Sequence, residues 1–338
     1  GASGSSYNFN RAGHIDKEGN VRLTTTSLDV SRTIPQLRGT EGVVYEFTVT
    51  EGGRIPSGYM VMTTDGRMEL YDSDGHIVDY TYMAGDDTVY RMVSDGARFG
   101  KIGRPEIAIL AYRKALEKSP NNKVITDTLI SIMRSPSAKP VEKFVVSMVL
   151  ISQKTLRYPL NHPQAGEVMS DSDVEAVRIE AMGVIGANKD TLRTMRTMEL
   201  QGRADMHYHT YRSDGSQTPS EVVVEGWLKG LPALSIVDHN TFKSHYEALK
   251  AGEFLSQGAT DANDEAIQVI PAVEFDFQFP AQGDPDYVAQ GKHSNNHIVV
   301  YYPNRGSADN YRAWIGDDPA RLGDRNQDVW NMRADLNG

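Results

Sequence analysis

The spacing of apolar residues changes twice along this chain, and this limits the folds that it can adopt. Over residues 7–100, short apolar runs rich in β-branched and aromatic side chains recur, such as Val43-Val44-Tyr45 and Tyr59-Met60-Val61. Asp65-Gly66 and Asp74-Gly75 lie between such runs, and these dipeptides favour tight turns between antiparallel strands. We therefore expect a mainly β, β-sandwich-like domain over residues 7–100, either an antiparallel sandwich or a small barrel.

Residues 104–200 have helical spacing instead. Arg104-Pro105-Glu106 begins a predicted helix that Ser119-Pro120 ends. The stretch 107–122 resembles the second helix of a tetratricopeptide repeat, and 177–185 resembles a HEAT-repeat helix. Neither recurs at a clean period, so the segment is expected to be a short helical bundle or solenoid.

From residue 204 onward, predicted strands and helices alternate. Thr218-Pro219-Ser220-Glu221 is a helix-capping box with proline at the first helical position, and a second helix is expected over 243–257. The predicted strands are 203–209, 233–237, 267–277 and 297–302. This order predicts a parallel sheet or barrel with its functional site at the C-terminal ends of the strands.

The composition restricts the chemistry. The sequence has no cysteine, which excludes disulfides, a thiol nucleophile and cysteine-ligated zinc, and leaves histidine and carboxylate as the strong metal ligands. Residues 1–204 are balanced in charge, while 205–338 hold 20 acidic and 10 basic residues and so carry the whole net charge of −10. Such a domain does not bind a nucleic-acid backbone by itself, but it can bind cations that then receive an anionic substrate.

The start of the chain and its hydropathy bear on location. Residues 1–6 are Gly-Ala-Ser-Gly-Ser-Ser, typical of a flexible tether or a tag. This start and the absence of cysteine fit an exported protein and a tagged one equally well, so the compartment stays open. No apolar stretch approaches the length that a membrane span needs.

Histidines and carboxylates gather at the predicted strand ends of the last segment. Because side chains alternate along a strand, Asp205, His207 and His209 project to one side. The other candidates are Asp214, in the following loop, Asp238 and His239 at the end of the next strand, Glu274 near the end of another, and His297 at the start of the last. Imidazole with carboxylate suits zinc, manganese or iron. For His245 and His293, an ordinary structural role is the expectation.

These residues carry a resemblance to a known family. The segments Asp205–Thr210, Ser213–Gly215, Pro219–Glu221, Ser235–Thr241, Ile270–Glu274 and His297–Tyr301 are similar, in order and at compatible spacing, to the motifs of the PHP (polymerase and histidinol phosphatase) family. The resemblance covers about 205–302 and says nothing about 1–204.

The resemblance implies a distorted β/α barrel that binds two or three divalent metal ions, of manganese, iron or zinc, at the strand ends. By this resemblance His207 and His209 would ligate one metal, with Glu274 bridging to a second. Asp214 and His239 would complete the neighbouring sites, and His297 would ligate a third metal. Asp205 and Asp238 are better placed to orient the ligating imidazoles.

The chain departs from the family pattern in three places. Ala272 and Asn240 stand where the family usually has glycine and aspartate, and neither is expected to touch metal. The family also supplies a further histidine and an Asp-x-His pair after the His297 position, and this chain has no histidine there. The barrel over 204–338 is therefore expected to be incomplete: the chain is a fragment, which the intact ligands favour, or a partner supplies the missing strands, or the protein is a degenerate member.

The sequence thus predicts a metal-dependent phosphoesterase that acts on a small phosphomonoester or nucleotide through a metal-activated water. The alternative is a non-catalytic structural or adhesive protein with a metal-stabilised PHP module. In either case, the β and helical regions are where a protein partner or a second copy would bind.

Overall fold

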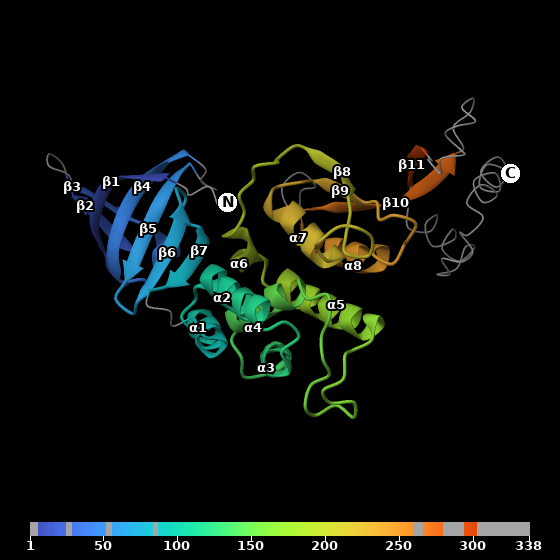
Figure 1. The fold of residues 1–338 in the computed structure, drawn as a ribbon, viewed down its shortest axis with the longest axis horizontal. Coiled ribbons are helices and arrows are strands. Elements are labelled where there is room, and N and C mark those ends of the chain that lie inside the picture. Colours follow the sequence, from blue (N-terminus) through green and yellow to red (C-terminus); the bar gives the residue numbers. More distant parts are fainter. Residues whose placement is uncertain are drawn as a thin grey trace. The chain divides into compact units, whose positions relative to one another are not determined.

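The computed structural model describes residues 6–24, 29–51, 56–83, 87–259, 266–279 and 294–302. The chain divides into two compact units, each described by itself: unit 1 is Gly1–Val149 with Arg157–Val168, and unit 2 is Leu150–Leu156 with Met169–Gly338 (Figure 1). The boundary between the units therefore lies inside the 104–200 segment that the sequence treats as one piece.

Unit 1 begins with a single seven-stranded antiparallel sheet. Its strands are β1 (Ser6–Ile15), β2 (Asn20–Thr24), β3 (Asp29–Thr33), β4 (Gly42–Glu51), β5 (Ser57–Thr63), β6 (Arg67–Asp72) and β7 (Ile77–Tyr82). They pair in the order β3-β2-β1-β4-β5-β6-β7. The described residues thus form one sheet, neither the two layers of the expected sandwich nor a closed barrel.

The sheet packs one face around a single core. Register partners project to the same face of a sheet, and the pairs Ile15 with Val21 and Val44 with Val61 are both buried in one cluster. Leu37, from the short 3-10 helix η1 (Pro35–Leu37), is buried in the same cluster. The apolar face of this sheet is therefore buried in one cluster with η1, without a second sheet in the described residues.

The predicted tight turns are confirmed, and one predicted β stretch is wrong. Gly66 and Gly75 have φ values of 85° and 88° between β5, β6 and β7, a conformation that other residues rarely adopt. Residues 89–100 form α1 (Val89–Lys101) and not β structure. Thr88 caps this helix by accepting a hydrogen bond from the Arg91 N–H, so the local capping signal decided the conformation.

The helices that follow match the predicted period. They are α2 (Pro105–Lys118), α3 (Lys123–Arg134) and α4 (Pro140–Leu150). Asn122 begins α3 by accepting hydrogen bonds from Val124 and Ile125 N–H groups. The predicted helix that starts after Arg104 and ends at Ser119 is confirmed.

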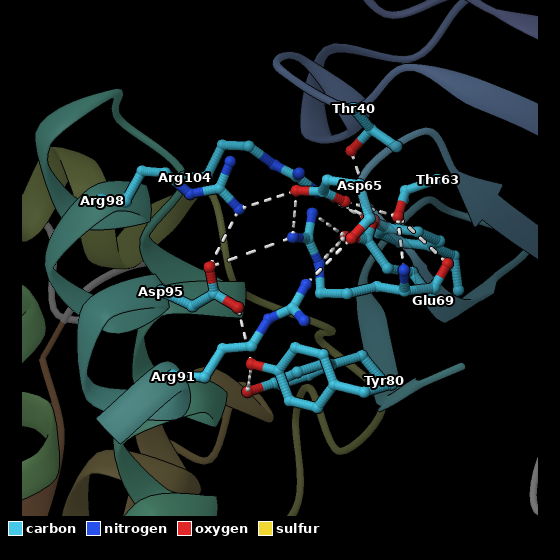
Figure 2. A network of polar contacts seen from close by, with 12 residues as sticks. Thr40, Thr63, Asp65, Glu69, Tyr80, Arg91, Asp95, Arg98 and Arg104 are labelled. Carbon is cyan, nitrogen blue, oxygen red and sulfur yellow. Dashed lines mark hydrogen bonds and ion pairs between the residues drawn. The ribbon is translucent and has the colours of Figure 1, made fainter. Parts of the chain in front are cut away.

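A buried polar network joins the sheet of unit 1 to its helices (Figure 2). The inward-facing side chains of β6 are Arg67, Glu69 and Tyr71, each exposed by 2% or less. The Arg67 guanidinium donates two hydrogen bonds to Glu69, of 3.1 and 3.0 Å. Arg104, at the start of α2, lies 3.7 Å from the other Glu69 oxygen, which also accepts a hydrogen bond of 3.3 Å from Thr40. The carboxylate of Glu69 is therefore the shared counter-charge of two buried guanidinium groups.

Replacing Glu69 by Ala is expected to lower the free energy of unfolding by about 3–5 kcal/mol, because Arg67 and Arg104 would lose the buried carboxylate that faces both of them, although Arg67 would keep Asp65 and Asp95 nearby. Chemical denaturation of the full chain measures this. The matched control is Glu46→Ala, which removes the half-exposed partner of Arg32 and should cost less than about 1 kcal/mol. Equal effects of the two substitutions would contradict the assignment.

The turn before β7 is tied to α2 by an ion pair. His76 Nδ1 lies 2.8 Å from Glu106 Oε1, and Glu106 Oε2 accepts a hydrogen bond from the Ile77 N–H at 3.3 Å. The hydrogen bond to Glu106 raises the pKa of His76 above its usual 6.5, against the effect of burial, with Asp72 and Asp74 adding to the rise. Folding thus shifts the protonation equilibrium of His76 toward the charged imidazole.

Because the folded pKa of His76 is raised, its contribution to stability is complete below pH 6.5 and is lost as the pH rises through the folded pKa. Thermal unfolding of the wild type and His76→Gln, measured from pH 5 to 9, should differ most at the acid end. The difference should shrink at higher pH, where His76 is neutral in both states. A difference that does not change with pH would contradict this.

Unit 2 contains a curled four-stranded sheet and its helices. Its elements are α5 (Asp171–Ala187), α6 (Lys189–Arg193), β8 (Ala204–Tyr208), α7 (Pro219–Leu228), β9 (Ala233–Ile236), α8 (His245–Ser256), β10 (Gln268–Phe279) and β11 (Ser294–Tyr301). The predicted capping box is confirmed, since Thr218 accepts a hydrogen bond from the Glu221 N–H at the start of α7. Within this unit α8 packs on α5, α7 and β10.

The strand order is β11-β10-β9-β8, and the expected all-parallel arrangement is wrong for one strand. β8, β9 and β10 are parallel, but β11 is antiparallel to β10. The sheet is curled, because the Tyr301 hydroxyl on β11 donates a 2.8 Å hydrogen bond to the Met206 carbonyl on β8, at the opposite end of the strand order. The described residues show this curled sheet and do not form a closed barrel.

Within the described part of the chain, the helices are too short or too polar to cross a membrane.

Candidate metal centre

The first strand of unit 2 brings two imidazoles together. His207 lies on β8 and His209 directly follows it, and the alternation of side chains directs both to the same side. Their Nε2 atoms are 3.0 Å apart. Strand geometry alone therefore produces a pair of neighbouring nitrogen donors.

Glu274 on β10 completes a triangle with these two histidines. Its Oε2 atom lies 3.1 Å from His207 Nε2 and 3.2 Å from His209 Nε2, across the intervening strand β9. Ligands of one transition-metal ion lie about 3 Å from each other, because each is roughly 2 Å from the metal. The three atoms are thus spaced as ligands of a single ion.

Asp214 and His239 form a second group with His209. The Nδ1 atom of His209 is 3.3 Å from one Asp214 oxygen, and His239 Nε2 is 3.6 Å from the other. The rings of His209 and His239 are stacked, with centroids 4.6 Å apart. Desolvation opposes ionisation of Asp214, but the two imidazoles nearby lower the pKa of this carboxyl below its usual value.

His297 approaches the other oxygen of Glu274. Its Nδ1 atom lies 2.5 Å from Glu274 Oε1, and its ring meets that of His239 edge-on at 5.1 Å. The antiparallel direction of β11 explains this contact, since it places the beginning of that strand beside the later part of β10. Glu274 therefore faces His207 and His209 with one oxygen and His297 with the other.

Three overlapping groups in the described residues could bind a metal ion, and they share members. They are His207, His209 and Glu274; His209, Asp214 and His239; and His239, Glu274 and His297. Together they contain all six residues that the sequence suggests as ligands, which we call the histidine–carboxylate cluster. The structure brings every one of these six residues together.

The donor atoms of the cluster fit a cation. Glu274 is 3% exposed, and its Oε2 atom faces two imidazole nitrogens, while the buried Nδ1 atom of His209 faces Asp214, but neither atom forms a hydrogen bond in the described structure. Leaving a buried carboxylate oxygen unmatched is unfavourable unless a proton or a cation compensates for its charge. Four imidazoles and two carboxylates are a ligand set suited to zinc, manganese or iron.

The backbone after β9 holds His239 beside Glu274. These two residues form a parallel bridge beyond the end of β9, and the Asn240 N–H donates a 2.9 Å hydrogen bond to the Glu274 carbonyl. Asn240 has a φ of 52°, which asparagine tolerates better than most residues. Asn240, which differs from the aspartate usual in the PHP motif, thus adopts a left-handed backbone conformation that lets its N–H reach Glu274.

Asp205 and Asp238 orient backbone and hydroxyl groups next to the ligands. Asp205 Oδ1 accepts a 3.2 Å hydrogen bond from the His207 N–H. Asp238 is fully buried and accepts hydrogen bonds from the Thr210 N–H and hydroxyl, both 2.6 Å, and from the Ser213 hydroxyl, 2.7 Å. These contacts position the backbone at His207 and the loop between His209 and Asp214. The two aspartates had been expected to orient the imidazole rings instead.

The sequence reasoning missed Thr210 and Ser213 as supports of the cluster. Both lie within the motif segments, and small hydroxyl residues beside a buried aspartate were the available signal. His245 is buried and its Nε2 lies 2.6 Å from the Ala272 carbonyl, and it belongs to none of the three groups found in the described residues. His293 lies outside the described residues.

Comparison of the chain with protein-family models, with curated proteins and with solved structures finds no match. The description of this site therefore depends on its own geometry and on the motif resemblance.

Replacing Asp238 by Ala is expected to destabilise unit 2 by roughly 1–3 kcal/mol for each buried donor left without an acceptor. The Thr210 N–H and hydroxyl are the affected donors, since Thr210 is fully buried. Urea unfolding of the full chain measures the change. Ser213→Ala, which removes one hydroxyl and keeps the aspartate, should have a smaller effect, and the reverse order would contradict this description.

Proposed function

We propose that unit 2 is a metal-dependent phosphoesterase of the PHP type, acting on a small phosphomonoester or nucleotide. The observation that carries this proposal is the position of Glu274, whose two oxygens face imidazoles from different strands. A carboxylate so placed can bridge two cations, and paired divalent cations are suited to phosphoryl chemistry.

The charge of the cluster supports an anionic substrate. With neutral histidines, Asp214 and Glu274 give the six residues a formal charge of −2, and two divalent cations would change it to +2. The acidic surroundings would repel a phosphate group in the absence of such cations. Substrate binding is thus expected to depend on metal, and the negative charge of 205–338 disfavours a nucleic-acid substrate.

The exposure of the six side chains suggests how they divide the work. Glu274 lies at the bottom of the cluster, with a side chain only 5% exposed, while His207, Asp214 and His297 are 52%, 69% and 43% exposed. The buried carboxylate would keep the cations in place, and the exposed residues leave the cluster open to solvent and substrate. Bound divalent ions would supply an activated water nucleophile and neutralise the phosphoryl oxygens.

The double substitution of His207 and His209 by Ala tests the proposal. It should remove bound metal, seen by elemental analysis, and lower hydrolysis of an aryl phosphate by more than about 100-fold, since changes next to metal ligands already cause losses of about 10–100-fold. His162→Ala, in unit 1 and stacked on Tyr158, is the matched control and should change neither measurement.

Two results would contradict the proposal. One is a wild-type protein that is purified without transition metal and stays inactive when manganese, iron or zinc is restored. The other is a double variant that loses stability while the wild type hydrolyses no phosphoester. The latter result favours a non-catalytic module that metal stabilises.

A further inference from the structure

A fully buried arginine contacts the loop that joins His209 to Asp214. Arg178 on α5 and Glu247 on α8 are both 0% exposed. The guanidinium donates to the two carboxylate oxygens through Nε, at 2.8 Å, and Nη2, at 2.7 Å. It also donates a 2.9 Å hydrogen bond from Nη1 to the Gln153 carbonyl and a 3.0 Å hydrogen bond from Nη2 to the Tyr211 hydroxyl, and its Cζ lies 5.5 Å from the centroid of the Tyr211 ring.

Glu247 is equally well matched. Its Oε1 atom also accepts hydrogen bonds from the Ser220 N–H, at 3.1 Å, and from the Ser220 hydroxyl, at 2.7 Å, at the start of α7. A buried ion pair is weak support for stability, because desolvation offsets much of the attraction. What such a pair does provide is a fixed geometry, and here that geometry reaches α5, α7, α8 and Tyr211.

Tyr211 is the link to the candidate metal ligands. It lies in the loop that starts at His209 and ends at Asp214. The loop also has its own hydrogen bonds, from the Tyr211 N–H to the Gln217 carbonyl at 2.8 Å and from the Ser213 and Gly215 N–H groups to the Thr210 carbonyl at 3.0 Å. Other groups also anchor the loop: Asp238 through Thr210 and Ser213, and Asp171 on α5 through a 2.8 Å contact with Arg212.

We propose that Arg178, held by Glu247, is a positioning residue of the metal centre: through the Tyr211 hydroxyl it sets the loop that carries His209 and Asp214. The inference rests on the proposed metal centre. It differs from that proposal because it concerns the contact between Arg178 and Tyr211, and neither residue lies in the motif segments. Misplacing the loop would separate Asp214 from His239 and weaken cation binding without unfolding the unit.

Tyr211→Phe tests this most directly, because it removes only the hydroxyl and keeps the Arg178–Glu247 pair. In the metal-free full chain, amide hydrogen exchange at residues 210–215 should become roughly 10-fold faster, the usual effect of losing a hydrogen bond to a charged group. Exchange elsewhere in unit 2 and the melting temperature should stay at wild-type values. The affinity for Mn²⁺, measured by titration calorimetry, should fall by a similar factor.

Two further variants complete the experiment. Arg178→Lys keeps the charge but cannot make the paired contact with Glu247, so it should give the same local exchange effect together with a lower melting temperature. Ser256→Ala is the matched control: it removes a hydroxyl that bonds the Ile267 backbone, at 3.3 and 3.1 Å, at the other end of α8. This control should change neither loop exchange nor Mn²⁺ affinity.

The outcomes separate the two proposals. Wild-type exchange and wild-type Mn²⁺ affinity in Tyr211→Phe would overturn the positioning role, even if the wild type hydrolyses phosphoesters. Faster loop exchange and weaker Mn²⁺ binding in that variant support the role, even if the wild type hydrolyses none. A wild type that binds no Mn²⁺, Fe²⁺ or Zn²⁺ overturns the role together with the metal centre.

Discussion

The constraint on which unit 2 depends is the carboxylate of Glu274, a charge that lies almost wholly out of water in the middle of a curled sheet. Such a group is tolerated only when nearby groups compensate for it. Its surroundings are imidazoles: His207 and His209 beside one oxygen and His297 beside the other. The curl of the sheet is what makes this possible, because it brings β8 over β10 across the strand between them. Fold and candidate site are therefore two aspects of one arrangement, in which the sheet curls around a buried acid.

Each unit also contains a buried arginine–glutamate pair, and the two pairs act differently. In unit 1, Arg67 and Glu69 are two residues apart on one strand, and the pair is extended by Arg104 from the start of α2. In unit 2, Arg178 and Glu247 come from helices far apart in the sequence. Neither pair is expected to add much stability over an apolar replacement of the same shape. Their contribution is to specify which elements meet, since a guanidinium with all its partners in place has few alternative positions.

The proposed function rests on the geometry of the cluster, which concerns metal binding, and on the charge and motif arguments, which concern the substrate. The spacing and burial of the histidine–carboxylate cluster show that it could hold a metal ion. The step from cations to a phosphoester depends on the charge reversal that those cations would bring and on the similarity of the motifs to the PHP family. The comparisons with known proteins find no match that would indicate a substrate. The hydrolysis measurements therefore test the substrate class.

Local sequence signals determined the turns at Gly66 and Gly75, the cap at Thr218 and the helix that begins after Arg104, and strand alternation with motif order indicated the six residues of the cluster. Other features were decided only by tertiary structure. The single sheet in place of a sandwich, the antiparallel β11 and the curl that joins Tyr301 to Met206 all depend on pairings between distant segments. The role of Arg178 was likewise not readable from its neighbours in sequence, and neither were Thr210 and Ser213 as the partners of Asp238. A periodic pattern reports which side of an element is buried, but a buried charge finds its partner through space, and only the folded chain shows which partner that is.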